Sequence, residues 1–107
     1  MKMSNDSESV IRELQNKVHE FGKKRDWLKH HSPKNLSMAL SIEASELMEI
    51  FQWQTEEQSR NLSDDDHAHA AQELADVFMY TLLVAKALNI DLEEATRNKL
   101  KTNEARF

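Results

Sequence analysis

The chain has 107 residues, enough for a single domain over residues 1–107, and it contains no cysteine. Disulfides, thiolate metal sites and cysteine nucleophiles are therefore excluded, so any bound metal takes oxygen or nitrogen ligands. The net charge of −5 argues against the basic surface that nucleic acids and anionic membranes require, and no apolar stretch approaches the roughly 20 residues that cross a bilayer. We expect a cytoplasmic protein with no nucleic acid or membrane partner, and a helical domain of this size gains from forming a homo-oligomer.

The chain has one glycine and one proline, which leave little of the turn chemistry that a multi-stranded sheet needs, so helices are expected throughout. Two of them are predicted in the first half. A first helix is predicted from about residue 7 to residue 25, where apolar residues recur at helical spacing: Val10, Ile11, Leu14, Val18 and Phe21. Ser32 followed by Pro33 is typical of a helix start, and a second helix is expected to run to about Gln54. The polar stretch 55–61 closes it.

Two further helices are predicted in the second half. Ser63, followed by three aspartates at 64–66, places a capping hydroxyl and negative charge at the start of a third helix that reaches about Leu88. Asn89 ends that helix. Asp91 and Glu94 have the spacing of a capping box, which predicts a short fourth helix from residue 92 into the tail. The predicted fold class is all-α.

Acidic residues fall on the apolar faces of the second and third helices. At about 100° per residue, Glu43 lies within the leucine arc of the second helix, with Glu46 at its edge and Glu49 farther round. On the third helix, Glu73 lies inside the apolar arc and Asp76 follows at its margin. That arc contains Leu74, Val77, Tyr80, Val84 and Leu88. Burying an unpaired carboxylate costs several kcal/mol, so clustered acids need raised pKa values or a cation. Carboxylate oxygens without cysteine favour Mg²⁺, with Mn²⁺ as the alternative.

A solvated acidic face or a di-iron centre fits these acids less well. A solvated face would place them opposite the leucines, and a di-iron bundle needs Glu-x-x-His pairs, whereas Glu73 is followed three residues later by Asp76. The sequence has no phosphate-binding glycine loop, serine-hydrolase elbow or HExxH zinc motif. The aspartates at 64–66 are interpreted as a helix cap and are not counted in the site.

The spacing of these acids resembles the signature of one family. Glu43-x-x-Glu46, followed after 26 residues by Glu73-x-x-Asp76, is similar to the motif of the MazG-like nucleotide pyrophosphohydrolases. Further segments, which together extend the likeness over nearly the whole chain, resemble the dCTP pyrophosphatase branch of that family: RDW at 25–27, HSPKN at 31–35, ELMEIFQW at 46–53, ELADVFMY at 73–80 and NKLKTNEARF at 98–107.

The resemblance implies a four-helix-type bundle completed by oligomerisation, as a dimer or a tetramer. It implies that Glu43, Glu46, Glu73 and Asp76 hold Mg²⁺ against a nucleoside triphosphate. The implied reaction converts dNTPs, preferably dCTP or modified pyrimidine nucleotides, to dNMP and pyrophosphate, as house-cleaning of the nucleotide pool. One acid, Glu46 or Glu49, is expected to orient the attacking water.

The resemblance also implies how the substrate is bound. Trp27 and Trp53 match positions at which relatives stack a base between aromatic rings, and His31 and Tyr80 are expected to rim that pocket. Three donors match the C-terminal segment of the family and are expected to contact the phosphates: Lys99, Asn103 and Arg106. The structural alternatives are ordinary packing of the tryptophans and a basic last turn that complements the helix dipole.

Two functional alternatives stay open from the sequence. A non-catalytic helical interaction module would pair the inward acids with basic residues of a partner protein. A related pyrophosphohydrolase would act on another metabolite, such as phosphoribosyl-ATP. Metal-dependent nucleotide binding separates the first alternative from the proposed enzyme, and a substrate panel separates the second.

Overall fold

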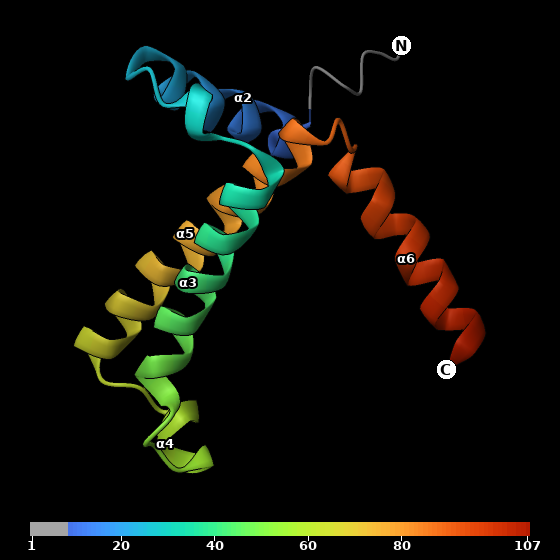
Figure 1. The fold of residues 1–107 in the computed structure, drawn as a ribbon. Coiled ribbons are helices and arrows are strands. Elements are labelled where there is room, and N and C mark those ends of the chain that lie inside the picture. Colours follow the sequence, from blue (N-terminus) through green and yellow to red (C-terminus); the bar gives the residue numbers. More distant parts are fainter. Residues whose placement is uncertain (1–8) are drawn as a thin grey trace.

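The computed structural model describes residues 9–107, and every regular element within them is a helix. The elements, in chain order, are α2 (Val10–Lys24), the 3₁₀ turn η1 (Leu28–His30), α3 (Pro33–Phe51), α4 (Glu56–Arg60), α5 (Asp64–Ala87) and α6 (Leu92–Arg106). Helices α3 and α5 run antiparallel side by side, α2 crosses near one end of this pair, and α4 lies at the other end (Figure 1). The prediction of an all-α fold is confirmed.

The long helices begin at side-chain caps. Ser32, Ser63 and Asp91 each accept a hydrogen bond from the backbone N–H three residues on, at the three starts that the sequence predicts. Helix α2 begins at Val10 with Ser9 as its cap, while residues 7 and 8 of the predicted first helix lie outside the described residues.

The structure adds a short helix to the polar stretch 55–61. Thr55 and Gln58 form a reciprocal capping box there: the Thr55 side chain accepts from the Gln58 N–H, and the Gln58 side chain accepts from the Thr55 N–H. The sequence predicts only a polar connection at this point, because five residues are too few to show a helical period.

Two helices end in the same way, on a non-glycine residue with left-handed backbone. Asp26 has a φ of 60° and Asn89 a φ of 56°. The N–H of the residue after each donates to a carbonyl five residues earlier, Trp27 to Gly22 at 3.0 Å and Ile90 to Ala85 at 2.8 Å. These bonds are those of the Schellman motif. The predicted helix end at Asn89 is therefore observed.

The buried core of a single chain is small. Four apolar residues are buried in the described chain: Leu36, Leu82, Leu83 and Ala85. Helix α5 packs against both α3 and α2, so its buried residues extend beyond the single arc that its sequence predicts. Conversely, Leu74 and Leu88, which belong to that predicted arc, are 57% and 50% exposed.

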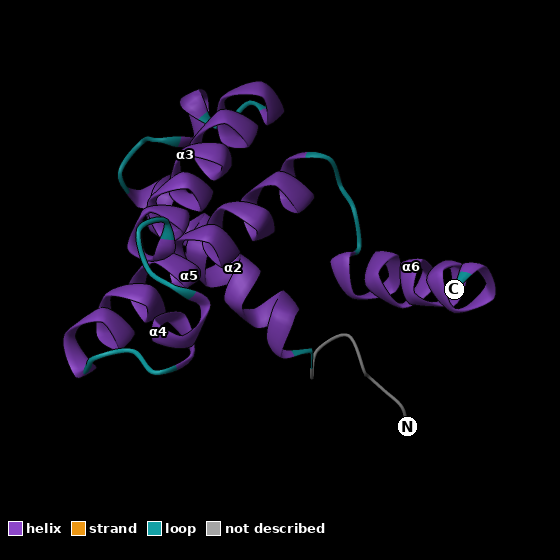
Figure 2. Cartoon of the chain, turned by 90° about the horizontal axis from the view of Figure 1, so that it is seen from below, coloured by secondary structure: helices purple, strands orange, loops and turns teal. Residues whose placement is uncertain are grey.

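Helix α6 stands apart from the other helices. It projects away from α2, α3 and α5 in two perpendicular views, joined by a short loop (Figures 1 and 2). At its base an Arg12–Asp91 ion pair of 3.5 Å and a hydrogen bond of 3.3 Å from Ser9 Oγ to Glu93 link it to α2. The Cα radius of gyration is 16.6 Å, against about 13 Å for a compact chain of this length. A single chain therefore leaves the bundle open.

None of the described helices has the length and hydropathy of a membrane-spanning segment.

Candidate functional site

An acidic cluster lies between α3 and α5. One carboxylate oxygen from each of Glu43, Glu73 and Asp76 lies within 4.8 Å of the other two. Glu43 comes from the middle of α3, while Glu73 and Asp76 lie one turn apart on α5. Glu73 is only 8% exposed, and the other two side chains are half-buried. The packing of two antiparallel helices thus brings these acids to one point.

The electrostatics of this cluster suit a cation. Partial burial, followed by the hydrogen bonding and charge of the Glu46 and Asp76 carboxylates, raises the pKa of Glu43 from 4.5 to about 7. Within residues 9–107, no basic side chain forms an ion pair with Glu43, Glu46, Glu73 or Asp76. Three converging hard oxygen donors without a neighbouring positive charge fit a divalent ion such as Mg²⁺.

The other predicted acids occupy different positions. Glu46 is half-buried and close enough to Glu43 to affect its pKa, but its oxygens are not among the three that converge. Glu49, one turn farther along α3, is exposed. The aspartates at 64–66 lie in the first turn of α5 behind the Ser63 cap, as expected of a helix start. The ligand role of Glu46 and the water-orienting role of Glu46 or Glu49 stay predictions.

A pocket of about 140 Å³ lies beside the cluster and shares Asp76 with it. Three residues predicted at the substrate site, Trp27, His31 and Tyr80, line this pocket. They come from the turn after α2, the end of η1 and the second half of α5, respectively. The fold therefore joins an aromatic pocket to the acidic cluster through one shared carboxylate.

Phe21 is a pocket residue that the sequence analysis places only in the apolar stripe of its helix. Its ring meets that of Trp27 edge to face, with centroids 5.7 Å apart and an interplanar angle of 67°. The Arg25 guanidinium lies 3.5 Å from the centroid of the Phe21 ring. Helical spacing predicts that Phe21 faces inward, but nothing in that pattern separates a pocket wall from a core residue.

His31 has an unusual environment within this pocket. Its Nδ1 atom is buried without a hydrogen-bond partner. Burial, together with the nearby His19 and His30, lowers the pKa of His31 from 6.5, so the neutral imidazole is favoured. A neutral ring with an unused nitrogen is able to accept or donate one hydrogen bond to a bound molecule.

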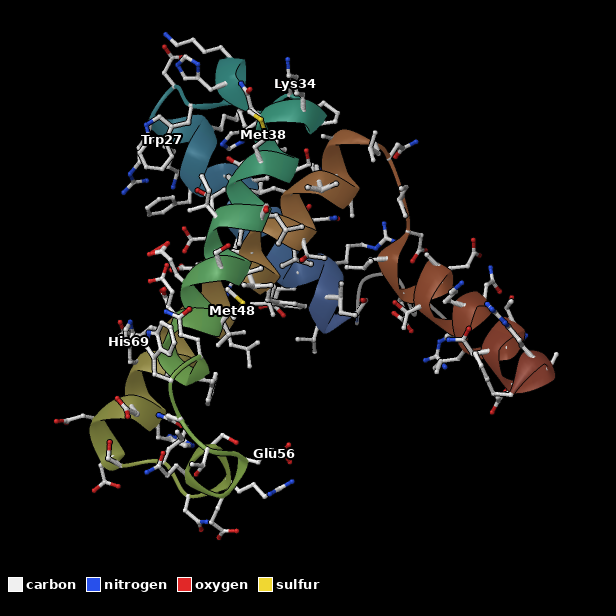
Figure 3. The ribbon with its side chains drawn as sticks, turned by 60° about the horizontal axis from the view of Figure 1, so that its bottom comes forward. Trp27, Lys34, Met38, Met48, Glu56 and His69 are labelled. Atoms are coloured by element: carbon white, nitrogen blue, oxygen red, sulfur yellow. The ribbon has the colours of Figure 1, made fainter. Side chains whose placement is uncertain are left out.

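Within one chain, the other predicted substrate residues do not reach this pocket. Trp27 lies near Lys34 and Met38 at one end of α3, whereas Met48 lies toward the opposite end, beyond which Trp53 follows (Figure 3). Trp53 is 89% exposed. The three predicted phosphate contacts lie on the projecting helix α6: Lys99, Asn103 and Arg106. The substrate roles of these four residues stay predictions.

The chain is similar to a known family and to several known proteins. Residues 38–107 match the MazG-like family. The chain is 34% identical over 103 residues to dCTP pyrophosphatase 1 of Bos taurus, and 33% identical over 102 residues to dCTP pyrophosphatase 1 of Homo sapiens. Each alignment covers 94% of this chain, which spans 61% and 60% of the length of these relatives.

A solved structure extends the likeness to three dimensions. The crystal structure of a pyrophosphatase from Archaeoglobus fulgidus matches with a TM-score of 0.86 at 35% sequence identity. The match covers 92% of this chain and 93% of the other. The arrangement of the helices is therefore that of the archaeal protein.

Proposed function

The chain belongs to the MazG-like family, and from this premise we propose that it is a Mg²⁺-dependent nucleoside triphosphate pyrophosphohydrolase. It converts dNTPs, with a preference for dCTP or modified pyrimidine nucleotides, to dNMP and pyrophosphate. The observation that carries the proposal is the convergence of Glu43, Glu73 and Asp76 within 4.8 Å beside a pocket that shares Asp76. The names of the relatives, dCTP pyrophosphatase 1 and an archaeal pyrophosphatase, support the same reaction class.

The reaction breaks the anhydride bond between the α- and β-phosphates. The oxygen of a water molecule bonds to the α-phosphorus, pyrophosphate leaves, and the proton of the water passes to a nearby base. Glu43, Glu73 and Asp76 would hold a Mg²⁺ or Mn²⁺ ion, with Glu46 as the fourth predicted ligand. Such an ion would supply positive charge to the phosphates. Because Glu46 is half-buried beside Glu43 while Glu49 is exposed, Glu46 is the better placed of the two to orient the water.

The aromatic pocket binds the base. The ring of Trp27 offers a stacking face, an interaction worth roughly 1–3 kcal/mol per base. His31 and Tyr80 offer hydrogen-bonding groups on the same pocket, and the unpartnered Nδ1 of His31 lies buried there. Because Asp76 belongs to both pocket and cluster, a base bound beside Trp27 places its phosphates next to the acids.

We further propose that the enzyme is a homo-oligomer, either a dimer or a tetramer. The predicted phosphate donors on α6 do not reach the cluster of their own chain, so a second copy has to supply them. Large apolar side chains that are more than half exposed support an extensive interface: Val10, Phe21, Ile42, Met48, Trp53, Leu74, Leu100 and Phe107. The role that we propose for the enzyme is house-cleaning of the cytoplasmic nucleotide pool.

Product analysis tests the reaction. Purified protein is incubated with each common dNTP, several modified pyrimidine dNTPs and phosphoribosyl-ATP, with and without Mg²⁺. We expect dNMP and pyrophosphate only with metal, fastest for dCTP or a modified pyrimidine, and no turnover by Glu46→Gln. Orthophosphate as the first product would overturn the assignment. Calorimetry with Mg²⁺ and a non-hydrolysable dCTP analogue tests the interaction module, which predicts no metal-dependent heat.

A further inference from the structure

The only glycine of the chain is in a position where glycine is normally unfavourable. Gly22 lies within α2 and has ordinary helical backbone, although glycine inside a helix is less stable than alanine. The two left-handed positions, where glycine is preferred, are instead occupied by Asp26 and Asn89. Backbone freedom therefore does not account for Gly22, and its surroundings have to.

Gly22 is in close contact with His31. A Cβ atom on residue 22 would lie 3.0 Å from Cε1 of His31, 3.8 Å from Nδ1 and 3.9 Å from Nε2. Carbon atoms in good contact are about 3.5–4.0 Å apart, so a methyl group here would push the ring away from α2 by a few tenths of an ångström. The His31 ring rests against the backbone of α2 because residue 22 has no side chain.

The His31 ring is also a wall between two cavities. One is the pocket of about 140 Å³ that contains Trp27 and Asp76. The other, of about 130 Å³, lies on the side of His19 and Lys86. A ring displaced from α2 has to enter one of these spaces, so the position of His31 sets the width of the pocket.

Gly22 acts on a second wall of the same pocket through its carbonyl. This oxygen accepts hydrogen bonds from the N–H of Trp27 at 3.0 Å and from that of Arg25 at 3.1 Å. These bonds fix the turn that carries Trp27 to the pocket. Gly22 thus positions both the His31 ring and the turn that carries Trp27.

We propose that Gly22 is a positioning residue that sets the width of the base pocket by holding the His31 ring against α2. Any side chain at position 22 moves this ring, changes the pocket and weakens nucleotide binding, most strongly for large bases. The proposal deepens the proposed function and rests on it for the identity of the ligand. The contact between the two residues stands independently of any ligand.

The test compares Gly22→Ala with Lys23→Ala, which places the same alanine at the next, exposed helix position. When a binding pocket loses the space of one methyl group, discrimination between substrates changes by about tenfold or more. We expect Gly22→Ala to raise KM for dCTP, and Kd for its non-hydrolysable analogue, by about tenfold, with kcat within about twofold of wild type. The affinity of Gly22→Ala for purine nucleotides is expected to fall more than its affinity for dCTP. Lys23→Ala is expected to bind as wild type.

His31→Ala and the double variant Gly22→Ala/His31→Ala complete a cycle. If Gly22 acts through the His31 ring, the added methyl has little further effect once that ring is gone. The proposal would be overturned if Gly22→Ala bound nucleotide as wild type does. It would also be overturned if the added methyl lowered nucleotide affinity equally in the wild-type and His31→Ala backgrounds. Should Gly22→Ala fail to fold, folding of the double variant supports the proposal and its failure to fold overturns it.

Nuclear magnetic resonance without nucleotide separates this proposal from the proposed function. We expect the Cε1 proton of His31 to show a cross-relaxation contact with the α protons of Gly22, and its signal to shift in Gly22→Ala but not in Lys23→Ala. An unchanged His31 signal in Gly22→Ala would refute the positioning role, whether or not nucleotide binds. A shifted signal in a protein that binds no nucleotide would refute only the proposed function.

Discussion

The α3–α5 pair and helix α6 differ in what holds them in place. Helices α3 and α5 pack along their length, contain the buried residues Leu36 and Leu82, and bring the three acids together. Helix α6 has a side-chain cap at Asp91 and an internal Arg97–Glu93 ion pair of 3.1 Å, yet it buries none of its residues. Local capping is thus well formed in both regions, whereas tertiary packing is present in only one.

This difference shows where the site is self-sufficient and where it is not. An isolated helix of 15 residues is only marginally stable in water, and α6 buries none of its residues within its own chain. In the proposed homo-oligomer, a second copy would supply the surface that stabilises it. The acids come from the region that is packed within the chain. The predicted phosphate donors come from the region that is not.

The largest expected effect concerns the packed region. Glu73→Gln replaces one of the three converging carboxylates by a neutral amide, so we expect turnover to fall by about a thousandfold or more, about 4 kcal/mol, and Mg²⁺ affinity to fall with it. Steady-state kinetics and calorimetry with Mg²⁺ measure this. Glu20→Gln, an exposed acid on α2, serves as the control. Wild-type activity of Glu73→Gln would show that the acidic cluster is not the catalytic site.

A core substitution contrasts the stability of the two regions. Leu82 is 1% exposed and Leu100 on α6 is 57% exposed. We expect Leu82→Ala to lower the free energy of unfolding by about 2–5 kcal/mol, and Leu100→Ala to change it by about 0.5 kcal/mol or less in dilute protein. Chemical denaturation at several protein concentrations tests both. If Leu100→Ala lowered the free energy of unfolding as much as Leu82→Ala at every protein concentration, α6 would be packed within its own chain.

The pH dependence of stability is a third difference. The folded chain without metal holds the pKa of Glu43 at about 7, against 4.5 ordinarily, so its contribution to stability is complete below pH 4.5 and is lost as pH rises through 7. We expect a loss of about 1–2 kcal/mol between pH 4.5 and pH 8, below the full linkage value because solvent screens this partly exposed carboxyl.

Thermal unfolding in the presence of a chelator measures this loss, and two comparisons check its origin. Glu43→Gln should remove the pH dependence, because the amide does not titrate. Added Mg²⁺ should reverse it, because the ion binds the deprotonated acids. An unchanged pH profile in Glu43→Gln would place the titrating group elsewhere.

The smallest expected effect concerns α6. Lys99→Ala should raise KM for the triphosphate by about fivefold, near 1 kcal/mol, while the melting temperature stays within about 2 °C of wild type. Lys101→Ala, on a different face of the same helix, is the matched control.

Mixing the variants tests where Lys99 acts. If the donors on α6 serve the cluster of another copy, Lys99→Ala chains mixed with Glu73→Gln chains form some sites with both groups intact, and activity at low substrate concentration exceeds the sum of the separate samples. If mixtures that have exchanged subunits recovered no activity, this result would contradict the shared site.

Much of the fold follows from local patterns in the sequence. Ser32, Ser63 and Asp91 mark the starts of three helices and Asn89 marks an end, because caps satisfy backbone groups within a few residues and leave a local signature. The helix wheel also places Glu43 and Glu73 inward, since the direction of a side chain on one helix depends only on its period.

The sequence by itself determined the long helices, the inward direction of Glu43 and Glu73, and the family resemblance. Only the tertiary structure decided which groups meet. The contact of Gly22 with His31 and the edge-to-face contact of Phe21 with Trp27 depend on the path of the chain after α2. The sharing of Asp76 between pocket and cluster depends on how α2, α3 and α5 cross. Crossing geometry arises from side chains that are distant along the chain and pack together, and no local period records it.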